Sequence, residues 1–460
     1  MTIPIRRLSL VICFLATYTV SFAADKPKAA DTNVPDPRLE RFVNSGVTVT
    51  TTPFIGTFSE QISASILYNL PSINEDLVLL QQREELYKHL NEHNLTLTHP
   101  VIGISGALEA AATHSSAYSL DPGAGNGSVN LSTAELDIAA LINRWATAYF
   151  SLDYDSSPVS SGSRAENSKL YLKRGFLTIG DLSRTPFYVT AGQMYAPFGL
   201  YRSTMLTTPL TKSMGRVLQR MMLVGYDSGG FAASLYGYHS NLSGKNTIPF
   251  NEGGVNLLLK HQFKTVKLRV SMGAISNMAD SQGMMGNGLS STSYNDSNVA
   301  QFTGFSSLGN ETLSHSVPGV AVDVLADWPH WSVIAGYVGA VDSFSTNDLT
   351  FNGEGASPKA AHLELDYIWH WYHKPITVGV SYGHTWQALG LNLPEDSISL
   401  IVNTSPWENI AVGVEYRHRM NYASGTTATG LTSAGTMAAV PDVSSGGTQD
   451  GVTLQVGVYF

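Results

Sequence analysis

The chain has 460 residues, a formal net charge of −9 and one cysteine, Cys13. The acidic balance argues against nucleic acid as a partner, because nucleic-acid-binding domains are usually basic. Cys13 lies in a segment that we expect to be removed, which excludes disulfides and thiolate metal sites from the mature chain. Glycine and tyrosine are abundant, and no later apolar run approaches the roughly 20 residues of a membrane-spanning helix. We therefore expect either a secreted β-protein or an outer-membrane barrel.

Residues 1–23 have the pattern of a secretory signal peptide. Arg6 and Arg7 precede an apolar run over 8–20, and Ser21-Phe22-Ala23 is a small-x-small cleavage site. The run is too short to serve comfortably as an uncleaved anchor. We expect a periplasmic region over 24–100, followed by a barrel over 101–460.

A helix is predicted at about 73–93. Ser72 and Glu75 form a capping box. Apolar residues then follow at helical spacing, with an interruption at Glu84; they are Ile73, Leu77, Leu80, Tyr87 and Leu90. One interpretation is a short coiled coil on the periplasmic side that holds protomers together, for example as a homotrimer. The other is an amphipathic helix packed on its own barrel or in its mouth. The sequence does not decide between them.

From residue 101 onward, apolar and polar residues alternate in segments of about ten residues, a length that spans a bilayer when the strand is tilted. In one segment Leu363, Leu365 and Tyr367 share a face, and Glu364 and Asp366 lie on the other. This pattern predicts an all-β fold, a sixteen-stranded antiparallel transmembrane β-barrel. The predicted strands are 101–112, 132–142, 145–155, 169–180, 187–194, 221–226, 230–238, 253–262, 266–276, 318–326, 331–341, 360–370, 376–387, 396–404, 410–419 and 451–460.

The connections and the chain end favour a barrel in the bacterial outer membrane. Long and short connections alternate, as outer loops and periplasmic turns do in such barrels. Six of the seven tryptophans lie beside predicted short turns, as an interfacial aromatic belt would. The last segment ends in Phe460, which partly matches the signal read by the barrel-assembly machinery, although Val458 stands where an aromatic is usual. Expected partners are therefore that machinery, outer-membrane lipid and lipopolysaccharide.

If the apolar face meets lipid, the charged face lines the lumen. Acidic residues come mainly from early and late strands and basic residues from middle ones, so a transverse field could orient charged solutes. The alternative is that these charges are paired and structural. The predicted lumen residues are Lys260, Lys267, Arg269, Glu364, Asp366, Glu415 and Arg417, together with Glu109, Glu135, Asp137, Asp153 and Asp323.

The connection 195–220 carries four basic residues and no acidic one. Lys212, Arg216 and Arg220 are four apart, so a helical turn would place them on one face. We interpret the segment as a loop folded into the pore that presents a basic, aromatic-edged constriction to an anionic solute. The alternative is a surface loop that contacts lipopolysaccharide or a neighbouring subunit. The candidate constriction residues are Tyr195, Tyr201, Arg202, Lys212, Arg216 and Arg220.

No nucleophile motif, phosphate loop or paired-carboxylate site has credible spacing, so we expect no enzyme activity, no catalytic residues and no cofactor. His362, His370 and His373 lie among strand residues and belt aromatics, and we interpret them as interfacial rather than metal-binding.

Two stretches resemble a known family. The run 69–77 (NLPSINEDL) followed by 80–83 (LQQR) resembles its N-terminal signature, and so does 185–193 (TPFYVTAGQ) with Tyr195 and Pro197-Phe198-Gly199 after it. Together they are similar to the legiobactin-receptor (LbtU) family of siderophore porins. The resemblance implies import of ferric siderophores across the outer membrane without a TonB-type plug domain. The Pro-Phe-Gly motif also resembles phosphate-selective porins.

Three functions follow from these observations. The first is a porin that passes ferric siderophore, or another small anionic solute, into the periplasm. The second is a general or anion (phosphate)-selective porin. The third is a surface barrel that acts in adhesion through its long loops.

Overall fold

The computed structural model describes residues 47–49, 74–97, 99–116, 127–154, 170–243, 249–286, 302–305, 311–372, 374–407, 409–432, 434–440 and 446–460. The expected signal peptide and the start of the periplasmic region lie outside these residues. Within the described part of the chain, none of the helices is long and apolar enough to cross a membrane.

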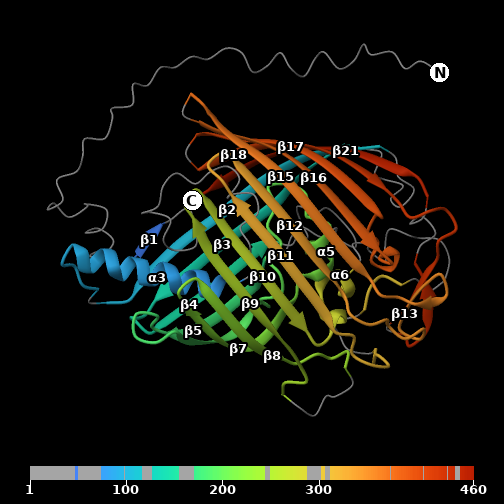
Figure 1. Ribbon diagram of the computed structural model, residues 1–460, viewed down its shortest axis with the longest axis horizontal. Coiled ribbons are helices and arrows are strands. Elements are labelled where there is room, and N and C mark those ends of the chain that lie inside the picture. Colours follow the sequence, from blue (N-terminus) through green and yellow to red (C-terminus); the bar gives the residue numbers. More distant parts are fainter. Residues whose placement is uncertain are drawn as a thin grey trace.

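In the described residues, sixteen antiparallel strands form a closed barrel, which confirms the predicted fold class (Figure 1). The ring closes where β2 pairs with both β3 and β21. The barrel strands are β2 (Val101–Ser115), β3 (Ser128–Leu141), β4 (Ala146–Tyr154), β5 (Leu170–Gly180), β6 (Phe187–Tyr195), β7 (Leu218–Ser228), β8 (Phe231–Tyr238), β9 (Glu252–Phe263), β10 (Val266–Ile275), β11 (Gly319–Asp327), β12 (Trp331–Ala340), β15 (Lys359–Trp371), β16 (Lys374–Trp386), β17 (Asp396–Trp407), β18 (Ile410–Met420) and β21 (Thr448–Tyr459).

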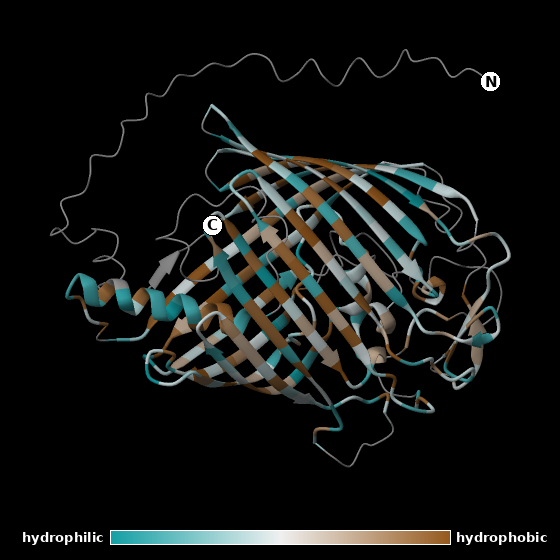
Figure 2. Ribbon diagram, viewed as in Figure 1, coloured by the Kyte–Doolittle hydropathy of each residue, from teal (hydrophilic) through white to brown (hydrophobic). Residues whose placement is uncertain are grey.

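The alternation in the sequence becomes the two faces of the barrel wall. On β15, Leu363 is 55% exposed on the outside, whereas Glu364 on the inside is fully buried. Figure 2 shows the resulting bands of hydrophobic and hydrophilic residues along the strands. The outer face can meet lipid because closure of the ring leaves no open sheet edge in the wall.

The two ends of the barrel differ. Tight turns join β7 to β8 and β9 to β10 at the end that carries most of the exposed tryptophans, including Trp371 and Trp407. Long connections lie at the other end, and the structure adds a small sheet there that the sequence did not predict. Its strands are β13 (Leu349–Phe351), β14 (Glu354–Gly355), β19 (Ala428–Leu431) and β20 (Met437–Ala439), each too short to show a clear alternation.

The C-terminus ends at the seam of the barrel. The backbone of Phe460 exchanges hydrogen bonds with Gly106, and a Cβ on Gly106 would lie 2.6 Å from the Phe460 ring. Residues of β2 before this point extend past the end of β21. The parallel strand β1 (Val47–Val49) pairs there with Ile102–Ile104 of β2. The terminal aromatic residue thus packs where only glycine leaves room.

Candidate functional site in the barrel lumen

The connection between β6 and β7, residues 196–217 and here called the inserted loop, lies inside the barrel. Its helix α5 (Leu210–Gly215) packs against β12, β15 and β16. These strands lie across the ring from β6 in the strand order. A second connection follows it inward, because the backbone N–H of Gln282 in α6 (Gln282–Met285) donates to the carbonyl of Arg216. The inserted loop therefore crosses the lumen and narrows it against the wall formed by β12, β15 and β16.

Buried carboxylates on the wall hold the inserted loop. Glu364 accepts hydrogen bonds from the Ser203 hydroxyl (2.6 Å) and from the backbone N–H of Thr204 (2.6 Å). The Thr204 hydroxyl lies 2.8 Å from Glu364 and 2.7 Å from Asp366. His362 adds a 2.9 Å contact to Glu364 from the wall itself. The loop thus supplies hydroxyl and amide donors to a wall that supplies the charge.

Two further carboxylates extend this anchorage to neighbouring strands. Asp323 on β11 accepts from the backbone N–H of Leu200 (2.8 Å), and Glu415 on β18 accepts from that of Thr207 (2.8 Å). The predicted lumen carboxylates Glu364, Asp366 and Glu415 do face inward, but the structure places them beneath the loop rather than beside open water. Their role in the structure is to anchor the loop.

Tyr201 and Arg202 do not form part of an open constriction. The Tyr201 ring is buried against Gly199 and Gly215, and its backbone takes the left-handed conformation (φ 48°). Arg202 lies 3.8 Å from Asp327, which Arg269 approaches at the same distance. Tyr201 thus packs inside the loop, and Arg202 shares the Asp327 carboxylate with Arg269 of the wall.

The predicted basic helical face is wrong. The helix α5 ends at Gly215, and Arg216 is already extended, with φ −66° and ψ 128°. Arg220 lies on β7 with Met222 and Val224, on the lipid side of the strand, where its Nε contacts Gln193 at 3.3 Å. The prediction from the i, i+4 spacing is wrong because the chain leaves the helix at Gly215 and enters β7 at Leu218. Side chains alternate along a strand, so Arg220 points outward.

Arg216 and Lys212 remain in the lumen, and a wall residue joins them. Arg216 lies over the Tyr195 ring (4.7 Å to its centroid), and its Nε donates to Gln282 at 2.8 Å. Lys173 on β5 interacts electrostatically with Arg216, and Lys212 interacts with both and with Glu109. We call Lys173, Lys212 and Arg216 the basic cluster.

Lys173 enters the lumen through an irregularity that the sequence analysis missed. Ser151 of β4 pairs with Arg174, but the next residue, Leu152, pairs with Leu172. This β-bulge leaves Lys173 unpaired, so both it and Arg174 point inward although they are adjacent. Two consecutive basic residues in an alternating segment were the only available signal.

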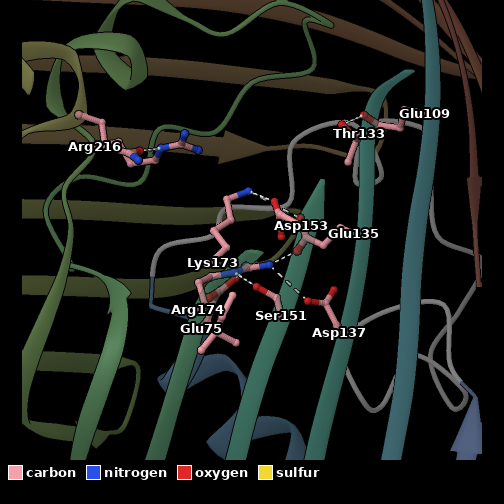
Figure 3. A network of polar contacts seen from close by, with 12 residues as sticks. Glu75, Glu109, Thr133, Glu135, Asp137, Ser151, Asp153, Lys173, Arg174 and Arg216 are labelled. Atoms are coloured by element: carbon pink, nitrogen blue, oxygen red, sulfur yellow. Dashed lines mark hydrogen bonds and ion pairs between the residues drawn. The ribbon is translucent and has the colours of Figure 1, made fainter. Parts of the chain in front are cut away.

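Acidic side chains of β3 and β4 surround these two cations (Figure 3). Lys173 pairs with Asp153 and lies 3.8 Å from Glu135. Arg174 donates to Ser151 (2.8 Å), to Asp137 (3.3 Å) and to Glu135. Glu109 lies farther along the same wall and accepts from Thr133 and Tyr459. The lumen therefore holds opposite charges on adjoining parts of its wall.

The other predicted lumen residues also face inward. The Lys260 ammonium contacts Gln81 at 3.0 Å, and Lys267 is exposed on the inward side of β10. Arg417 lines a small cavity between the wall and the inserted loop, with Thr207 and His362. In the part of the chain that the structure describes, no group of three or more histidine, aspartate or glutamate residues is arranged to hold a metal ion.

A closed barrel of this size, apolar outside and charged inside, with aromatic residues at one rim and a loop folded into the lumen, is a porin-type barrel of the outer membrane. Comparison with known sequences gives the family. The chain is 35% identical over 437 residues to the UPF0422 protein lpl2888 of Legionella pneumophila strain Lens, covering 93% of this chain and 79% of that protein. A UPF0422 protein of Coxiella burnetii is 35% identical over 407 residues, covering 86% and 80%. The chain belongs to the UPF0422 family.

Solved structures are more distant. An anion-selective porin from Comamonas acidovorans gives a TM-score of 0.48 at 9% identity, over 79% of this chain and 100% of that one. The channel DcaP of Acinetobacter baumannii gives 0.44 at 12% identity, over 79% and 99%. The chain matches no family model.

Proposed function

We propose that this barrel is a passive outer-membrane porin for small anionic solutes, with a negatively charged ferric siderophore as its cargo. The observation that carries the proposal is the convergence of Lys173, Lys212 and Arg216 where the inserted loop narrows the lumen. Fixed charges in a narrow, protein-lined pore act at close range, so they favour the solute of opposite sign.

The arrangement gives the solute a path rather than a tight binding site. Arg216 is held by Gln282 and the Tyr195 ring, and among the described residues it forms no ion pair with a carboxylate. Lys173 is paired with Asp153, so its charge is partly balanced. An anion would meet a partly compensated field, strong enough to attract it and weak enough to release it.

The siderophore part of the proposal draws on the sequence signature over 69–77 and 185–199, which resembles that of siderophore porins. Iron would arrive already chelated, so transport would need no protein ligand for the metal.

Uptake of labelled ferric siderophore under iron limitation tests the proposal. Cells that lack the gene are complemented with wild type, with Lys212→Glu plus Arg216→Glu, or with Arg220→Glu at matched surface amounts. We expect wild type and Arg220→Glu to restore uptake, because Arg220 faces outward, and the double variant to fail. Normal uptake in cells without the gene would exclude the siderophore role.

The same basic cluster also suits a smaller anion, so an anion-selective porin for phosphate is the second candidate. Conductance that saturates with phosphate, together with unchanged siderophore uptake on deleting the gene, would favour it.

A further inference from the structure

The helix α3 (Glu75–Glu92) lies in the periplasmic mouth of the barrel. Leu80, Leu86 and Leu90 are buried within this single chain and belong to one hydrophobic cluster with inward-facing wall residues. Those wall residues include Leu141, Tyr149, Phe176, Tyr188, Leu223 and Leu258. An apolar patch inside a water-filled pore is unfavourable unless something covers it. The apolar side of α3 is thus continuous with the apolar interior of the barrel.

Polar contacts fix the helix in one position. The Arg83 guanidinium, which is fully buried, donates to the Thr147 hydroxyl (2.8 Å) and to the carbonyl of Gly180. Two residues earlier on the helix, Gln81 donates to Asp227 of β7 at 2.6 Å and accepts from Lys260 of β9. The helix therefore bridges several strands of one half of the ring and narrows the periplasmic exit.

The N-terminal end of α3 carries acidic residues into a wall that is already acidic. Glu75 pairs with Arg174, and Asp76 accepts from the Thr190 hydroxyl at 2.9 Å. Arg174 also pairs with Glu135 and Asp137, so its charge is balanced without Glu75. The charged or titratable groups that face the two carboxylates are Lys173 and Arg174 on β5, Glu135 and Asp137 on β3, Tyr149 and Asp153 on β4, and Tyr188 on β6.

Glu75 and Asp76 together with these neighbours make five carboxylates against two cations. The docked end therefore has a surplus of negative charge when all of them are ionised. Burial raises the pKa of Glu75 to about 7, although the Arg174 guanidinium opposes the shift. Burial likewise raises the pKa of Asp76, against the hydrogen bond from Thr190. The docked helix thus binds protons more tightly than a free one. The contribution of Glu75 to docking of the helix is fully present below pH 4.5, the ordinary glutamate pKa, and is lost as pH rises through about 7.

We propose that α3 is a movable plug that sets the size limit at the periplasmic exit, docked when its N-terminal carboxylates are neutralised and released when they are charged. This goes beyond the anion selectivity proposed above, since it concerns the size of any solute, charged or neutral. The plug and the inserted loop would then control different properties of one pore.

Swelling of proteoliposomes that contain the full-length protein tests the plug. The probes are neutral sugars from monosaccharide to tetrasaccharide, at pH 5 and pH 8. We expect the entry rate of the larger sugars, relative to the monosaccharide, to rise several-fold at pH 8. Glu75→Gln plus Asp76→Asn should keep the pH 5 behaviour at pH 8. A relative rate that is equal at the two pH values in wild type would overturn the proposal.

Glu85→Gln is the control, because it removes one carboxylate from the exposed face of the same helix. It should respond to pH as wild type does. If it abolishes the response as fully as the double variant, then the charge of the helix as a whole, and not the docked end, is responsible.

A cross-link provides a test that does not depend on titration. Gln81→Cys plus Asp227→Cys places two thiols where the native side chains touch, and a short thiol-reactive cross-linker joins them. With the link closed, entry of the larger sugars at pH 8 should fall to the pH 5 value, whereas each single-cysteine variant should be unaffected by the reagent. Unchanged entry in the linked protein would show that α3 need not move. Neutral sugars do not sense the basic cluster, so a failure here leaves the proposed anion selectivity untouched.

Discussion

Two elements enter the barrel from opposite ends, and they are held in opposite ways. The inserted loop brings neutral hydroxyl and amide donors to carboxylates of the wall, such as Glu364 and Glu415. The helix α3 brings its own charges, Glu75 and Arg83, to the facing wall. In the loop half every carboxylate gains donors, whereas in the helix half carboxylates accumulate around two cations.

The difference teaches how a barrel can combine a fixed and a conditional insert. A buried carboxylate that accepts several hydrogen bonds is costly to expose or to leave alone, so the loop stays in place. A surplus of buried carboxylates is costly to keep ionised, so the helix depends on protons. The same residue type therefore anchors one insert and destabilises the other.

The largest expected effect comes from removing the anchor of the loop. Glu364→Ala leaves the Ser203 hydroxyl and the backbone N–H of Thr204 without their acceptor, which should lower the free energy of unfolding by about 3 kcal/mol. The freed loop should also raise single-channel conductance. Urea unfolding and bilayer recordings measure both effects. Glu354→Ala, on the exposed hairpin strand β14, is the control, and equal conductance in the two variants would contradict the anchoring role.

A similar change in the helix half should release the helix without opening the loop. Arg83→Met removes the donors to Thr147 and Gly180, at a cost of about 2–3 kcal/mol to docking. Limited proteolysis from the periplasmic side should then cut α3 faster, with the barrel intact. Lys88→Met, on the exposed side of the helix, is the control. Equal cleavage of the two variants would argue against Arg83 as an anchor.

The shape of the inserted loop should depend on Gly199, which has φ +87°. A Cβ there would lie 2.6 Å from Tyr201 Cζ, so Gly199→Ala adds a clash to backbone strain and should cost about 1–3 kcal/mol. Gly229→Ala shares the positive φ but meets nothing within 4 Å. The comparison of their unfolding free energies isolates the clash. An equal loss of unfolding free energy in the two variants would mean that the Tyr201 ring moves aside at no cost.

The smallest effect should come from a turn beside the helix. Asp181 accepts from the Ser183 hydroxyl (2.5 Å) and lies 3.1 Å from Arg144. Burial raises the pKa of Asp181, but Ser183 and Arg144 outweigh it and hold the pKa below the usual 3.8. The stabilisation is thus present above pH 3.8 and is lost as pH falls through the lower folded value. Asp181→Asn should cost about 1 kcal/mol at pH 7. A cost that persists below pH 3 would contradict this origin.

The fold could be predicted from the sequence because a barrel wall repeats one local rule. Each strand must alternate over a bilayer-spanning length, so even the short segment 221–226 was placed correctly and proved to be the middle of β7. The lumen carboxylates followed from the same parity. The groups that these carboxylates bind could not be predicted, because the loop partners of Glu364 are more than a hundred residues distant in the chain.

The site was only partly predictable, since it depends on departures from regular structure. The end of α5 at Gly215 broke the expected spacing of Arg216 and Arg220. A β-bulge brought Lys173 inward against the period-two rule. The position of α3 in its own barrel mouth was one of two interpretations, and the choice between them required the apolar wall that only the closed ring creates. The predicted homotrimer stays a prediction.

The most direct test of the account is the reversal potential of the channel in a salt gradient across a planar bilayer. Wild type should be anion-selective, and Lys212→Glu plus Arg216→Glu should move the reversal potential toward that of a cation-selective pore. Arg220→Glu makes the same kind of charge reversal at one site, only four residues from Arg216 but on the lipid side, and should leave the potential unchanged. A cation-selective wild type, or an equal shift with Arg220→Glu, would contradict the basic cluster as the selective element.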